Sequence, residues 1–136
     1  MREETLVVAT RALARREHSA QSLRERLQRA GVDVSEADRV VEELQRLGLL
    51  DDGRFARERA RVLAERGKGD AAIRFDLEGA GVEPAEIEEA LATLDPERDR
   101  AARLVDRRGP GPATARLLAG RGFDEAVVEA LVAPQP

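Results

Sequence analysis

Few side chains in this 136-residue sequence could carry acid–base or nucleophilic chemistry. Consecutive acidic residues stand at Glu42-Glu43, Asp51-Asp52 and Glu88-Glu89. Neighbours in a helix do not face each other, so these pairs fit a solvated surface or a first-turn charge better than paired catalytic carboxylates. The chain has no cysteine and one histidine, His18, which excludes thiolate nucleophiles, disulfides and metal sites built from several such ligands. We therefore expect no catalytic centre, no metal and no cofactor.

The positive signal lies in the segment that follows Asp51-Asp52. Between residues 53 and 69 there are six basic residues and two acidic ones, within a chain whose net charge is −4. Arg54, Arg57 and Arg61 would share one helix face, where they could meet phosphates or an acidic protein surface. Glu58 and Glu65 could equally neutralise that face from neighbouring turns. The sequence leaves both interpretations open.

The elements that must position these residues are short helices separated by glycines. Leu27, Leu77 and Leu118 each lie four residues before a glycine that an apolar residue follows, and further apolar pairs four residues apart come after each glycine. This spacing is typical of one helix face, and no long stretch alternates with the period of a strand. We expect Ser19, Ser35 (with Asp38) and Asp70 to cap helices, and Pro84 to stand in a first turn.

The shared register predicts an all-α fold of tandem three-helix repeats stacked into an elongated, curved, solenoid-like array. We place the repeats at residues 1–49, 50–94 and 95–133, the last being the shortest. Such an array exposes a long surface without needing a closed pocket, which suits the binding of another macromolecule. The longest apolar run is too short to cross a membrane, and the lack of cysteine favours a reducing, cytoplasmic location.

Three sequence motifs resemble the bacterial RecX family, the regulators of the RecA recombinase. The first is the stretch Ala12-Leu13-Ala14-Arg15-Arg16-Glu17-His18-Ser19, the second is Gly48-Leu49-Leu50-Asp51-Asp52-Gly53-Arg54-Phe55-Ala56, and the third is Gly67-Lys68-Gly69. The resemblance covers nearly the whole chain and is strongest from Ala12 to Val82. It implies a non-enzymatic, cytoplasmic protein that binds RecA or its filament on DNA and dampens ATPase, strand-exchange and co-protease activities.

The motifs and the arginine face together give our predicted partner-binding residues. They are Arg15, Arg16, His18, Asp52, Arg54, Arg57, Arg61, Lys68 and Arg74. Ser19, Asp51, Phe55 and Gly69 also match the family, with Ser19 and Asp51 fitting helix caps and Phe55 a core position.

This sequence also departs from the family at several basic or aromatic positions. It has Arg59 where an aromatic residue is common, and Asp70, Ala71 and Ala72 where glycine, proline and a basic residue often follow. We therefore expect a protein partner, a monomer, and at most a weak direct contact with DNA. The alternatives are a direct DNA-binding protein with helix-turn-helix-like units, and a helical scaffold for some other protein.

Overall fold

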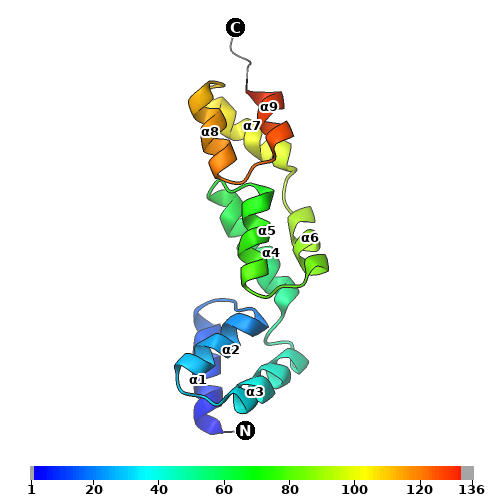
Figure 1. The fold of residues 1–136 in the computed structure, drawn as a ribbon. Helices are drawn as coiled ribbons and strands as arrows, with labels where there is room; N and C mark the ends of the chain where they lie inside the picture. Colours follow the sequence, from blue (N-terminus) through cyan, green and yellow to red (C-terminus); the bar gives the residue numbers. More distant parts are fainter. Residues whose placement is uncertain (1, 133–136) are drawn as a thin grey trace.

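The computed structural model describes residues 2–132, and over this range the chain is built of nine α-helices with no strand (Figure 1). The helices are α1 (Glu3–Arg15), α2 (Ala20–Arg29), α3 (Val34–Arg46), α4 (Asp52–Glu65), α5 (Asp70–Gly79), α6 (Pro84–Ala92), α7 (Glu97–Arg108), α8 (Pro112–Gly120) and α9 (Glu125–Leu131). Successive groups of three follow one another from the N-terminus to the C-terminus, which makes the molecule elongated. The prediction of an all-α array of three-helix units is confirmed.

Each group of three helices encloses its own hydrophobic cluster. The leucines that precede the repeated glycines, Leu27, Leu77 and Leu118, lie one in each cluster and are fully buried. The third cluster is the smallest, since α8 and α9 are short. We call these groups the first, second and third units. The limits 1–49, 50–94 and 95–133 stay a prediction, and residues 1 and 133 lie outside the described residues.

The turn between the second and third helices has the same geometry in every unit. Gly31, Gly81 and Gly122 have φ values of 90°, 78° and 85°. The N–H of the residue after each glycine donates to the carbonyl of the buried leucine, at 3.0 to 3.1 Å. Glycine is favoured there because positive φ is costly for residues with a Cβ, and the bond is that of a Schellman helix end.

The helix starts confirm some predicted caps and correct two others. Ser19 and Ser22 form a reciprocal capping box with two bonds of 3.0 Å, and Pro84 occupies the first turn of α6. The prediction that Ser35 caps the third helix was wrong. Asp33 does so, accepting from the Ser35 N–H at 3.2 Å, because the glycine turn leaves Asp33 extended one position before the helix.

Asp70 was also wrongly predicted as a cap. Gly69 precedes α5, and the Asp70 carboxylate instead accepts from Arg100 at 2.9 Å. Helix α5 therefore has no side-chain cap, and the Asp70 carboxylate instead takes part in the contact between the second and third units.

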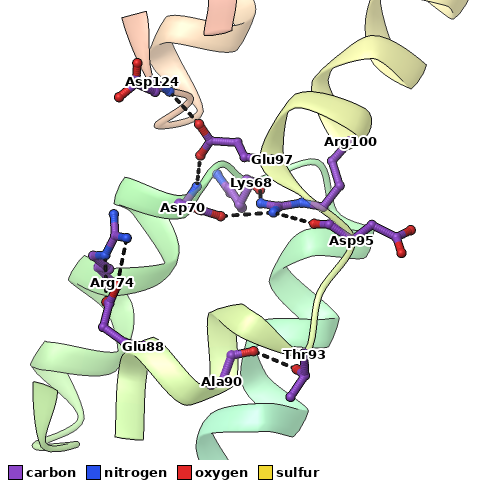
Figure 2. Close-up of polar contacts among 10 residues, drawn as sticks. All are labelled: Lys68, Asp70, Arg74, Glu88, Ala90, Thr93, Asp95, Glu97, Arg100 and Asp124. Atoms are coloured by element: carbon purple, nitrogen blue, oxygen red, sulfur yellow. Dashed lines mark hydrogen bonds and ion pairs between the residues drawn. The ribbon is translucent and has the colours of Figure 1, made fainter. Parts of the chain in front are cut away.

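The contacts between units follow one pattern that occurs twice. At the first junction the Ala20 N–H donates to Asp52 at 2.7 Å; at the second the Asp70 N–H donates to Glu97 at 2.6 Å (Figure 2). In both cases the first residue of a unit's second helix donates to an acidic residue at the start of the next unit's first helix. The repeated pattern explains how three small clusters make one array.

Each junction also contains a second hydrogen bond, whose acceptor is a backbone carbonyl in the glycine turn of the following unit. The Ser19 hydroxyl donates to the Ala80 carbonyl at 2.7 Å, whereas the Gly69 N–H donates to the Arg121 carbonyl at 2.8 Å. A Cβ on Gly69 would lie 2.5 Å from the backbone of Gly122, so only glycine allows this approach.

Candidate functional site

The arginine face predicted on α4 is mostly neutralised within the protein. Arg61 donates to Glu58 and Glu65, with its shortest bond to each at 2.6 Å. The hydrogen bond from Arg61 lowers the pKa of Glu58, and both carboxylates raise the pKa of the guanidinium. Arg59 forms a bidentate pair with Asp76, at 2.9 Å for both bonds. These guanidinium groups are therefore already engaged on the surface of the second unit.

Arg54 serves the junction between the first and second units. Its Nε donates to Glu17 at 2.7 Å, and its terminal nitrogens donate to the carbonyls of Gly48 and Leu49 at 3.2 Å. Asp52, another predicted site residue, accepts the Ala20 N–H at the same junction. Of the predicted face, Arg57 is the residue that makes no ion pair within residues 2–132, and it is exposed.

Lys68 and Arg74 lie further along the second unit, near the second junction (Figure 2). The Lys68 carbonyl accepts from Arg100 at 3.2 Å, while the lysine ammonium has no ion-pair partner among the described residues. Arg74 pairs with Glu88 through two bonds of 2.9 and 3.0 Å, and that hydrogen bonding lowers the pKa of Glu88. Lys68 therefore keeps a free charge, and Arg74 does not.

Arg15, Arg16 and His18 come together at the end of α1. They line a hollow of about 290 Å³ whose wall is completed by Arg11 on α1, Arg26 on α2 and the small apolar side chains of Val8 and Ala12. We call this feature the arginine hollow. Sequence reasoning missed Arg11 and Arg26. The four-residue spacing of Arg11 and Arg15 could have indicated the first, whereas Arg26 needs the packing of α2 beside α1.

His18 forms the buried part of the arginine hollow. It is 4% exposed, and its Nδ1 lies 3.0 Å from the Ser22 hydroxyl oxygen. Burial, followed by the charges of Arg16 and Arg26, lowers the pKa of His18. The imidazole is therefore neutral at pH 7, and the charge around the hollow comes from guanidinium groups alone.

Two features are absent from residues 2–132. No group of three or more histidine, cysteine, aspartate or glutamate side chains is placed to hold a metal ion in this range. No helix of the same range combines the length and the apolar character needed to cross a bilayer. A linear array of helical units belongs to the class of helical repeat proteins, whose stacked units expose an extended surface.

Comparison with known proteins identifies the family. The family model described as RecX, first three-helix domain, matches residues 6–44, and that of the second three-helix domain matches residues 51–91. A regulatory protein RecX of Halorhodospira halophila is 38% identical over 135 residues, which cover 92% of this chain and 84% of that protein. One of Stenotrophomonas maltophilia is 37% identical over 134 residues, covering 90% and 82%. The chain belongs to the RecX family of regulatory proteins.

Solved structures support the fold. The crystal structure of RecX from Lactobacillus salivarius matches with a TM-score of 0.79 and 15% identity, over 95% of this chain and 92% of that one. A second structure, titled as that of regulatory protein RecX, gives a TM-score of 0.77 and 19% identity, over 95% and 73%. The array of units is thus shared at low sequence identity.

Proposed function

We propose that this protein binds the RecA recombinase, or its filament on DNA, and inhibits the ATPase, strand-exchange and co-protease activities of RecA. The family resemblance implies this function, and relatives over most of the chain carry the name regulatory protein. In this proposal the protein is a cytoplasmic monomer that catalyses no reaction itself. Inhibition follows from occlusion of the filament or from promoted loss of its subunits.

The observation that carries the proposal is the linear arrangement of the three units (Figure 1). Both junctions use the same kind of hydrogen bond, from a backbone N–H of one unit to a carboxylate of the next, at 2.7 and 2.6 Å. The units therefore join end to end in the same orientation. An elongated array of this kind can lie along a filament and contact several of its subunits. A globular protein with one pocket could not do so as readily.

Within this function, the predicted partner-binding residues take two roles. Those without an ion pair among the described residues are proposed to contact the filament: Arg15, Arg16, Arg57 and Lys68. Those already bonded within the protein are proposed to hold that surface in place: Asp52, Arg54, Arg61 and Arg74. His18 lies beneath the arginines of the first unit.

Co-sedimentation with preformed RecA filaments on single-stranded DNA, together with a RecA ATPase assay, tests the proposal. We expect the protein to pellet with the filament and to lower the ATPase rate. The double variant Arg57→Glu, Lys68→Glu should bind at least about tenfold more weakly, because it reverses two free charges at the proposed contact. Arg98→Glu, Arg116→Glu is a matched control, since both residues are exposed and make no ion pair within residues 2–132.

Two outcomes would contradict the proposal. If the wild-type protein neither sediments with the filament nor changes the ATPase rate, the function is wrong. If both double variants lose affinity equally while keeping their helical circular dichroism, Arg57 and Lys68 are not at the contact. In that case only their assigned role is withdrawn.

A further inference from the structure

A cleft lies on the surface where the second and third units meet. It consists of two adjoining hollows, of about 350 and 400 Å³, which share the residues Glu65, Gly67, Leu104 and Arg107. The end of α4 lines one side and α7 lines the other, so both units contribute a wall. We call this feature the junction cleft. Cavities between packed units are common places for small ligands.

The first junction has a hollow in the corresponding place, but its chemistry differs. Asp52 and Glu97 are the first residues of α4 and α7, and they accept the equivalent junction bonds. Counting from these two residues, the positions of Phe55, Glu58 and Val62 on α4 correspond to Arg100, Arg103 and Arg107 on α7. The three α4 side chains line a hollow of about 190 Å³ at the first junction. The same helix face is therefore basic at the second junction alone.

Arg100 is the most unusual of these arginines, because it is only 9% exposed. Figure 2 shows its guanidinium beside Lys68, Asp70 and Asp95. One terminal nitrogen donates to the Asp70 carboxylate at 2.9 Å and to the Asp95 carbonyl at 3.2 Å, and the other donates to the Lys68 carbonyl at 3.2 Å. The Nε–H is buried and has no acceptor among the described residues. A buried N–H without an acceptor is rare and costly, and an ion or a water commonly supplies the missing oxygen.

The junction cleft also carries more positive charge than its carboxylates neutralise. Glu65 and Asp95 each pair with one arginine of the cleft. The cleft arginines that form no ion pair within residues 2–132 are Arg66, Arg107, Arg108 and Arg121. Gly67 leaves room for the last of these, since a Cβ there would lie 2.5 Å from the Arg121 guanidinium. These charges come from both units, so an anion between them would relieve repulsion across the junction.

We propose that the junction cleft binds a free, small oxyanion of the phosphate or carboxylate class that carries at least two negative charges. Planar guanidinium groups match the oxygens of both classes. One ligand oxygen accepts the Nε–H of Arg100, and others accept from Arg107 and its unpaired neighbours. Because the ligand contacts both units, its binding holds the third unit more firmly on the second. This site requires no RecA, and so it goes beyond the function proposed above.

A long polyanion fits the junction cleft less well than a small anion. The N–H that lacks an acceptor is buried, so only a compact group that enters the cleft can reach it. The volume of about 350 Å³ beside Arg100 is that of a small-molecule site. Glu65 and Asp95 are exposed in the cleft wall, where they repel the further charges of a polymer.

Isothermal titration calorimetry of the full chain with pyrophosphate and with citrate provides the first test. We expect saturable binding, and the anion that binds more tightly identifies the ligand as a phosphate or a carboxylate. The variant Arg103→Gln, Arg107→Gln should bind at least about tenfold more weakly, because it removes two charged donors. Arg98→Gln, Arg116→Gln removes the same charge from exposed positions of the third unit outside the cleft, and should keep nearly the wild-type affinity.

Two outcomes of the calorimetry would overturn the proposal. One is the absence of saturable binding of either anion by the wild-type protein. The other is an equal loss of affinity in the two double variants, which would show that the anion responds to overall charge and not to the cleft.

Amide hydrogen exchange measured by nuclear magnetic resonance tests whether the ligand holds the two units together. The Gly69 N–H donates to the Arg121 carbonyl across the second junction, and the Ala20 N–H donates to Asp52 across the first. With pyrophosphate at ten times its Kd, exchange at Gly69 should slow about tenfold, because opening the junction then requires release of the ligand. Exchange at Ala20 should stay unchanged. Equal slowing at both junctions, or none at Gly69, would overturn the bridging role.

A competition experiment distinguishes a free anion from a nucleic acid. Oligothymidylate is added to the protein saturated with pyrophosphate, and release of pyrophosphate is measured. Displacement of pyrophosphate, together with weaker oligothymidylate binding by Arg103→Gln, Arg107→Gln, would overturn the proposal in favour of a nucleic-acid ligand. Because RecA is absent from all these tests, their failure leaves the co-sedimentation result untouched.

Discussion

The arginine helix of the second unit and the arginine hollow of the first unit contain the same residue type in opposite electrostatic settings. On α4, Arg61 sits between Glu58 and Glu65, and Arg54 is used to join two units. Around the hollow, Arg11 and Arg15 have no ion-pair partner within the described range. A surplus of basic residues along a segment therefore does not locate the free positive surface, because partners one turn away decide how much charge is left.

The comparison predicts its largest effect on stability at Arg54. Replacing Arg54 with Gln removes one ion pair and two bonds to carbonyls, so we expect the free energy of unfolding to fall by about 1 kcal/mol after allowance for partial exposure. Arg57→Gln on the same helix and Arg15→Gln at the hollow should each change it by less than about 0.5 kcal/mol. Urea unfolding followed by circular dichroism measures all three. Equal effects would mean that Arg54 does not fasten the junction.

A smaller effect, on binding, is expected when the carboxylates that pair with an arginine of α4 are removed. The variant Glu58→Gln, Glu65→Gln leaves Arg61 without its partners. Affinity for RecA filaments in co-sedimentation should rise about threefold to fivefold, because the Arg61 guanidinium is then free to contact the filament. Glu125→Gln, Glu129→Gln on α9 changes the charge equally and serves as the control. No difference between the two variants would show that Arg61 is not restrained by its neighbours.

The smallest effect concerns pH and distinguishes the hollow from α4, which has no histidine. The pKa of His18 is lowered in the folded state from an ordinary value of 6.5, so the unfolded chain binds more protons between the two values. The contribution of the neutral His18 to the free energy of unfolding is fully present well above pH 6.5, and it declines as the pH falls below that value. His18→Gln should remove this decline below pH 6.5. Urea midpoints across that range would contradict the prediction if the wild type and the variant show the same slope.

The sequence was sufficient for the fold because the signals that specify it are local. A buried leucine four residues before a glycine fixes each turn between the second and third helices, and the three turns share one hydrogen bond. The wrong caps have a local cause too. Asp33 competes with Ser35 for one helix start, and Asp70 is drawn away by Arg100, which lies 30 residues further along the chain.

The candidate site could be predicted only in part, because some of its charges are balanced by distant residues, whereas Arg61 is paired with Glu58 and Glu65 on its own helix. Arg54 meets Glu17 across 37 positions, and Arg59 meets Asp76 across 17. No motif around α4 indicates those partners. Arg15, Arg16 and His18 were found through the family motif. Arg26 lies beside them only because α2 packs against α1.

The junction pattern gives the array a direction. The first and second units each donate one backbone N–H to the following unit, from Ala20 to Asp52 and from Asp70 to Glu97. The corresponding first position of α8 is Pro112, whose nitrogen carries no hydrogen. The third unit accepts this bond from the second, but its own second helix has no N–H at the matching position. The bonds therefore run one way along the array, from the second helix of one unit to the first helix of the next.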